Sequence, residues 1–226
     1  MSLFAVCWLG YQPLLTLLAR QPGGAINTDM TVVRMAWMNN MVRRENRFMD
    51  GQLLGQALNS ASFFASSNLI LIAAAASALF GGESTFRSAS SLVVIQTSSR
   101  LLFETQLALV LLTLARGLLD FIWSIRQMNY CIATIGAVPV DVGEAQHRAY
   151  GDIAGRLLNP ALSSFNTGVR GYYFALAAAA WLFGPIAFIT ATLGAVALLL
   201  WRQRRSRAAR AISDLRRLLE TESPPS

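Results

Sequence analysis

The residues with the clearest potential for chemistry are Arg116 and Asp120, which stand four positions apart in a long apolar stretch. Residues at this spacing lie on one face of a helix, so the guanidinium and the carboxylate can meet. Ionisable side chains are costly inside a membrane and often mark an ion or proton path. The alternative is a pair that neutralises itself near the cytoplasmic end of the stretch, with Arg116 reaching the headgroups. Asp120 favours this alternative, because it lies only about five residues from the end of the stretch near Ile125.

Polar side chains also share one face in each of two apolar segments. Such faces suit either a wet path between helices or hydrogen bonds that hold helices together, and both interpretations remain open. The candidates are Gln52, Gln56 and Asn59 in one segment, and Gln106 and Thr113 in the other.

Nothing in the sequence predicts an enzyme. It contains no G-x-S-x-G motif and no phosphate-binding loop, and the single histidine, His147, lies in a polar linker. The two cysteines, Cys7 and Cys131, form no CxxC motif. We therefore expect no catalytic residue, no metal site and no cofactor.

The elements that must position these residues are membrane helices. One run of thirty residues, Tyr172–Trp201, contains no ionisable acid or base other than tyrosine. About 18 consecutive apolar residues already indicate a bilayer span. The sequence thus predicts an all-α polytopic membrane protein that forms a single membrane domain over residues 1–226. We expect its hydrophobic segments at about 3–19, 53–80, 101–125 and 172–201.

Two amphipathic helices are expected on the cytoplasmic side, together with a basic tail. The first, at 28–50, carries methionine and tryptophan on one face, which suits either the membrane interface or packing on other helices. The second, a linker helix, is expected at 141–158 and to end at Asn159-Pro160. Residues 83–100 read as a loop with one helical turn, and the tail at 202–226 is rich in arginine.

The last hydrophobic run poses a question of topology. Basic residues favour the cytoplasmic side, and a single crossing would place the arginine-rich tail outside. Gly184-Pro185 lies near the middle of the run and is a strong chain breaker. Either these two residues turn the chain back as a hairpin with the tail in the cytoplasm, or the run is one long helix that breaks the rule.

All nineteen basic residues are arginine, and the formal net charge is +7. These arginines stand beside apolar runs, as residues near anionic headgroups do, so we expect the lipid bilayer and not nucleic acid as the partner. The expected location is a bacterial inner membrane.

Several stretches resemble an uncharacterised family of bacterial and plant membrane proteins, known only as domain of unknown function 599. They include Glu45–Asp50, Ser62–Ser67, Phe121–Cys131 and Phe165–Ala175. The resemblance implies a polytopic inner-membrane protein and carries no established activity. Its most specific part, Trp-Ser-x-Arg-Gln-x-Asn-Tyr-Cys, forms a predicted cytoplasmic rim for binding or for clamping helices, with Trp123, Arg126, Gln127, Asn129 and Tyr130.

Together these features favour a homo-oligomeric channel or transporter-like protein in which Arg116 and Asp120 are the charged elements. The alternative is an accessory or assembly subunit that docks on a larger membrane complex.

Overall fold

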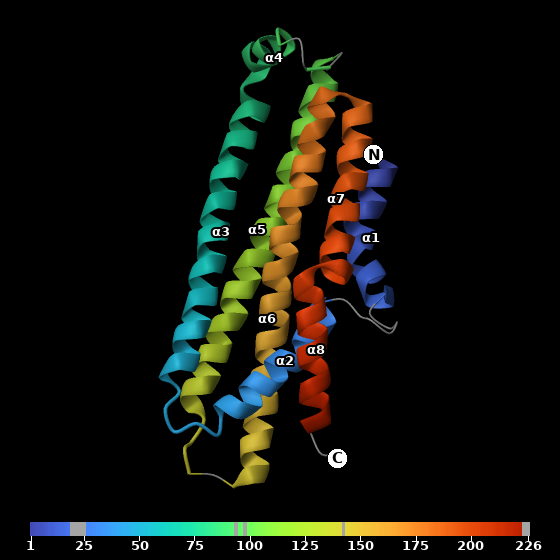
Figure 1. Cartoon of the computed structure of the whole chain (residues 1–226). Coiled ribbons are helices and arrows are strands. Elements are labelled where there is room, and N and C mark those ends of the chain that lie inside the picture. The colour runs from blue at the N-terminus through green and yellow to red at the C-terminus, as the bar shows by residue number, and fades with distance from the viewer. Residues whose placement is uncertain (19–25, 93–94, 97–98, 142, 223–226) are drawn as a thin grey trace. The chain divides into compact units, whose positions relative to one another are not determined.

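The computed structural model describes residues 1–18, 26–92, 95–96, 99–141 and 143–222, and within them the chain forms helices and no strand (Figure 1). The helices are α1 (Ser2–Leu18), α2 (Ile26–Met41), α3 (Phe48–Phe80), α4 (Gly82–Ser90), α5 (Arg100–Ala137), α6 (Glu144–Ala179), the 3₁₀ turn η1 (Ala180–Phe183), α7 (Pro185–Arg205) and α8 (Arg207–Glu222). The expected all-α fold is confirmed.

Among the described residues, three stretches of helix are long and apolar enough to cross a membrane: α3, α5 and residues Pro185–Thr221. The first part of α1, Ser2–Tyr11, is apolar but shorter. A 20-residue helix already spans about 30 Å. The 33 residues of α3 and the 38 of α5 therefore exceed what one crossing needs.

The chain divides into two compact units. The first unit contains Met1–Pro13, Phe63–Phe121 and Asn166–Leu199, and the second contains Leu14–Ser62, Ile122–Phe165 and Leu200–Ser226. Few charged residues fall in the first unit, whereas most of the arginines fall in the second.

In the first unit the chain turns back at Gly184. Its φ angle of 107° lies in the region that favours glycine. Phe4 of α1 packs against Phe174 of α6 and Phe188 of α7, with ring centroids 6.1 and 5.4 Å apart, so α6 and α7 lie side by side (Figure 1). Trp181 also stacks on Phe188 at 5.0 Å. The last hydrophobic run is thus broken at Gly184-Pro185 and forms a helical hairpin.

The first arm of this hairpin differs from the sequence-based expectation. The expected helix at 141–158 does not end at Asn159-Pro160, because α6 continues from Glu144 to Ala179 with Pro160 inside it. Proline removes one backbone hydrogen bond from a helix. Leu158 and Ala161, on either side, are completely buried in the core of the second unit, and this packing outweighs the loss.

Other boundaries also differ. The expected helix at 28–50 is interrupted between Met41 and Phe48, where α3 begins, and α5 extends to Ala137. The expected loop at 83–100 begins with the nine-residue helix α4.

The core of the second unit contains the methionine face of α2. Met38 and Met41 are fully buried together with Leu54, Met128 and Leu158. Of the two interpretations left open for this face, the structure shows packing on the protein's own helices. On another side, α2 contacts α8 through the buried carboxylate of Asp29, 2.9 Å from Arg216 Nη1.

Candidate functional site

Glycines bring α5 and α6 close together in the first unit. A Cβ atom on Gly168 would lie 2.7 Å from Cε1 of Phe121, and one on Gly171 would lie 3.4 Å from the Cα atom of Gly117. Small residues at a contact let helix backbones approach closely in membranes. This approach places side chains from α5 and α6 at one level of the unit.

Arg170 is the most enclosed charged side chain at this level, with 6% of its surface exposed. Its Nη2 atom donates a hydrogen bond to Thr167 Oγ1 at 2.6 Å. Its guanidinium carbon lies 5.5 Å from the ring centroid of Tyr11, a residue of α1 that is 3% exposed. A guanidinium over an aromatic face is a favourable cation–π arrangement.

Arg116 and Asp120 lie on α5, with 3.4 Å between Arg116 Nε and Asp120 Oδ2. The side chain of Arg116 is 58% exposed, whereas that of Asp120 is 18% exposed. The carboxylate also interacts electrostatically with Arg170. We call Tyr11, Arg116, Asp120 and Arg170 the charged network.

The sequence pattern alone did not place Tyr11 and Arg170 in this network. Arg170 reads as the flank of an apolar run, and Tyr11 as one aromatic residue of the first segment. The available signal was the pair Gly168 and Gly171, which marks a close contact of helices around Arg170.

Side-chain hydrogen bonds to backbone carbonyls tie the helices together near the network. Asn68 Nδ2 of α3 donates to the Leu114 carbonyl of α5 at 2.9 Å. The Tyr172 hydroxyl of α6 donates to the Phe64 carbonyl of α3 at 2.8 Å. The rings of Phe64, Phe121 and Tyr172 lie 5.9 to 6.0 Å apart and fill the space between the helices. These contacts hold the network in a fixed frame.

The two candidate polar faces have different surroundings. Gln106 and Thr113 are buried in the first unit. Gln106 Nε2 donates to the Trp181 carbonyl at 3.0 Å, and Thr113 Oγ1 donates to the Leu109 carbonyl at 2.7 Å. The first bond joins α5 to η1, whereas the second lies within α5. Gln52, Gln56 and Asn59 belong to the second unit and are exposed on α3.

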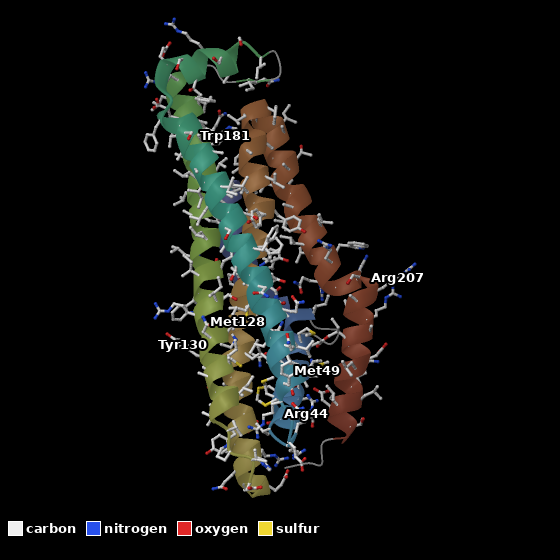
Figure 2. The ribbon with its side chains drawn as sticks, turned by 90° about the vertical axis from the view of Figure 1, so that its left-hand side faces the viewer. Arg44, Met49, Met128, Tyr130, Trp181 and Arg207 are labelled. Carbon is white, nitrogen blue, oxygen red and sulfur yellow. The ribbon has the colours of Figure 1, made fainter. Side chains whose placement is uncertain are left out.

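The predicted rim motif of α5 divides into two faces in the second unit. One face is buried against α6, where Ser124 Oγ donates to the Ala161 carbonyl at 2.7 Å and Gln127 is covered. The other face is exposed and carries Trp123, Arg126 and Tyr130, and Asn129 is exposed as well. Figure 2 shows Tyr130 on α5 beside Met128, which is completely buried. The motif therefore both clamps helices and presents a surface.

Comparison with known proteins identifies the family. The family model described as protein of unknown function, DUF599, matches residues 1–208. The chain belongs to this family. No curated protein and no solved structure matches the chain.

In this DUF599 protein, the stretch Glu45–Asp50 closes the turn between α2 and α3. Arg47 donates to the carbonyls of Val138 at 2.5 Å and of Val42 and Pro139 at 3.1 Å each. Asn46 Oδ1 accepts a hydrogen bond from the backbone N–H of Phe48 at 2.9 Å, which caps the first turn of α3. This part of the family resemblance has a structural role.

Asp50 is the other fixed charge of the same turn and is completely buried. Its Oδ1 atom accepts hydrogen bonds from Trp37 Nε1 at 2.7 Å and from Arg44 Nη1 at 2.5 Å. Figure 2 shows Arg44 close to the start of α3. Such partners offset the cost of removing a carboxylate from water. Within the part of the DUF599 chain that the structure describes, no three histidine, cysteine, aspartate or glutamate residues could hold a metal ion.

Proposed function

We propose that this DUF599 protein is a membrane transport protein for a small anion, built as a homo-oligomer. The observation that supports the proposal is the burial of Arg170 among helices of an apolar unit. Placing a charge in such surroundings is costly, and ionisable residues inside membrane proteins commonly mark a solute or ion path.

The sign of the charge supports an anion as the solute. In the first unit, Glu83 pairs with Arg87 at 2.9 Å, and Arg100 pairs with Glu104 at 2.7 Å. The remaining charged side chains of this unit are those of the charged network, where two guanidinium groups face one carboxylate. The network thus carries an excess positive charge, which an anion would neutralise.

Tyr11 adds a hydrogen-bond donor to the network. Its hydroxyl is buried and has no hydrogen-bond partner among the described residues. Such a group costs free energy unless it is bonded part of the time. An anion held by Arg170 would accept this hydrogen bond. Arg116 stands at the exposed side, where it would meet the entering solute or a second copy of the chain.

Reconstitution in liposomes tests the proposal. Purified protein should conduct a small anion such as chloride or nitrate, measured with an anion-sensitive dye inside the vesicles. We expect Arg170→Gln to abolish the flux, and Arg116→Gln and Asp120→Asn to alter it. Arg87→Gln is the control, because Arg87 is exposed and lies in the same unit. Equal anion flux in wild type and Arg170→Gln would refute the role of the network.

A second candidate is an accessory or assembly subunit, which the exposed face of α5 favours. Trp123, Arg126 and Tyr130 stand at helical spacing on this face, and Arg126 Nη2 lies 3.1 Å from the Tyr130 hydroxyl. Tryptophan, tyrosine and arginine are enriched at the energetic centres of protein interfaces. If this candidate is correct, purification in mild detergent should yield a stoichiometric protein partner that Trp123→Ala loses. A protein that purifies alone as a homo-oligomer would contradict it.

A further inference from the structure

A dense basic surface follows the last apolar stretch of the chain. Residues 185–200 of α7 contain no charged side chain, and Trp201 and five exposed arginines come directly after them. These arginines are Arg202, Arg204, Arg205, Arg207 and Arg210. We call Trp201 and these five residues the arginine elbow, because Ser206 separates α7 from α8 at this point.

Ser206 fixes the junction of the two helices. Its hydroxyl donates to the Arg202 carbonyl at 2.8 Å and accepts a hydrogen bond from the N–H of Ala209 at 3.1 Å. The second bond caps the start of α8. Figure 2 shows Arg207 at the start of α8, with its side chain directed away from the ribbon.

Two acidic residues of α8 pair with arginines outside the elbow. Asp214 lies 3.7 Å from Arg217, and Glu220 lies 2.8 Å from Arg216. No described carboxylate lies within ion-pair distance of Arg205, Arg207 or Arg210. Within the described residues, the charges of Arg205, Arg207 and Arg210 are therefore not cancelled by a carboxylate.

The elbow is also held in place. Arg216 Nη1 lies 2.9 Å from Asp29, whose side chain is 4% exposed, and this ion pair fastens α8 to α2 in the second unit. Partly buried Ile212 and Leu219 lie on the side of α8 that carries Arg216. A preorganised basic surface loses less entropy on binding than a free tail does.

We propose that the arginine elbow binds the headgroups of anionic phospholipids. The apolar stretch of α7 brings the arginines to the level where a membrane ends, and an exposed tryptophan suits the same level. Clusters of four to eight basic residues beside a membrane helix attract anionic lipids. This inference is independent of the proposed transport activity, since the elbow contains no residue of the charged network.

Lipid titration of the purified full-length protein tests the inference. The protein in a non-ionic detergent is mixed with phosphatidylglycerol or phosphatidylcholine, and native mass spectrometry measures the bound lipid. We expect stable binding of phosphatidylglycerol only. Each basic residue near the surface contributes a factor of about five in affinity, so Arg207→Gln/Arg210→Gln should weaken binding by about 25-fold.

A charge-matched variant provides the control. Arg148→Gln/Arg156→Gln removes the same two charges from exposed positions of α6 in the second unit, and it should bind phosphatidylglycerol like the wild type. Glycerol phosphate at the concentration of the lipid should not compete, because it lacks the acyl chains. Equal loss of lipid in both double variants, or binding unchanged in Arg207→Gln/Arg210→Gln, would overturn the inference. Full competition by glycerol phosphate would show that the elbow binds a free phosphate ester and not specifically a lipid.

Discussion

Replacing Gly168 with alanine should destabilise the protein, although alanine normally favours a helix. In a helix interior, glycine costs about 0.5–1 kcal/mol relative to alanine. At Gly168, however, the new Cβ atom would lie 2.7 to 2.9 Å from three ring atoms of Phe121. That ring is completely buried and packs against the rings of Phe64 and Tyr172, with ring centroids 5.9 and 6.0 Å away. It cannot swing away without displacing both neighbours.

The magnitude follows from a comparison with Gly194. This residue lies on α7 of the same unit, and a Cβ atom placed there meets nothing within 4 Å. Gly194→Ala should therefore raise the free energy of unfolding by the helix-propensity term alone. Both variants gain that term, so the difference between them isolates the overpacking cost at Gly168, which is about 1–3 kcal/mol.

Unfolding with sodium dodecyl sulfate, followed by tryptophan fluorescence in detergent, measures the two variants side by side. Adding Phe121→Leu to Gly168→Ala should recover part of the loss, because the smaller side chain relieves the contact, and the two substitutions should therefore be non-additive. If Gly168→Ala is as stable as Gly194→Ala, the close packing of α5 and α6 is wrong. The placement of Arg170 in the charged network would then be wrong as well, because it depends on this packing.

The other predictions concern the turns, one buried cation and the tail. Arg47→Lys should lower stability by about 2–4 kcal/mol in the same unfolding assay, because one compact ammonium nitrogen cannot reach all three carbonyls that the two Nη atoms of the guanidinium bond, and stability equal to wild type would contradict the clamp. Gly184→Ala should cost at least about 1 kcal/mol, because φ at this residue is positive, and no loss would argue against the turn. Burial lowers the pKa of Arg34 to about 10, so Arg34→Met should stabilise the protein at neutral pH by roughly 1–3 kcal/mol, and destabilisation would show an unrecognised partner. A reporter fused after Ser226 should report a cytoplasmic position, because the arginine-rich tail favours that side of the membrane. A signal from the external side would exclude a cytoplasmic tail.

The sign of the Arg34 effect follows from proton linkage. The pKa in the folded state lies below the ordinary value of an arginine, so the unfolded chain holds this proton more tightly. The penalty is fully present below pH 10 and shrinks as the pH rises above 10 towards the ordinary pKa of arginine. At neutral pH the substitution removes the whole penalty.

Helix periodicity and hydropathy were sufficient to predict the fold class and the long apolar helices α3 and α5, because both depend on local composition. Gly184-Pro185 was also recognisable, since few other pairs break a helix so strongly. Pro160 was misjudged for the opposite reason. Whether a proline ends a helix depends on the packing around it, and Leu158 and Ala161 are buried by residues distant in the sequence.

The charged network shows why a site of this kind is only half visible in a sequence. Arg116 and Asp120 could be paired in advance because helix geometry alone brings residues four apart together. Arg170 and Tyr11 join them from two other helices, and only the tertiary contact at Gly168 and Gly171 brings α5 and α6 together here. The two arginines also differ in burial. Arg116, which the sequence pairs with Asp120, is exposed, whereas Arg170, at the flank of an apolar run, is the buried cation. Because desolvation makes a buried charge costly, Arg170→Gln is the variant whose transport phenotype bears most directly on function.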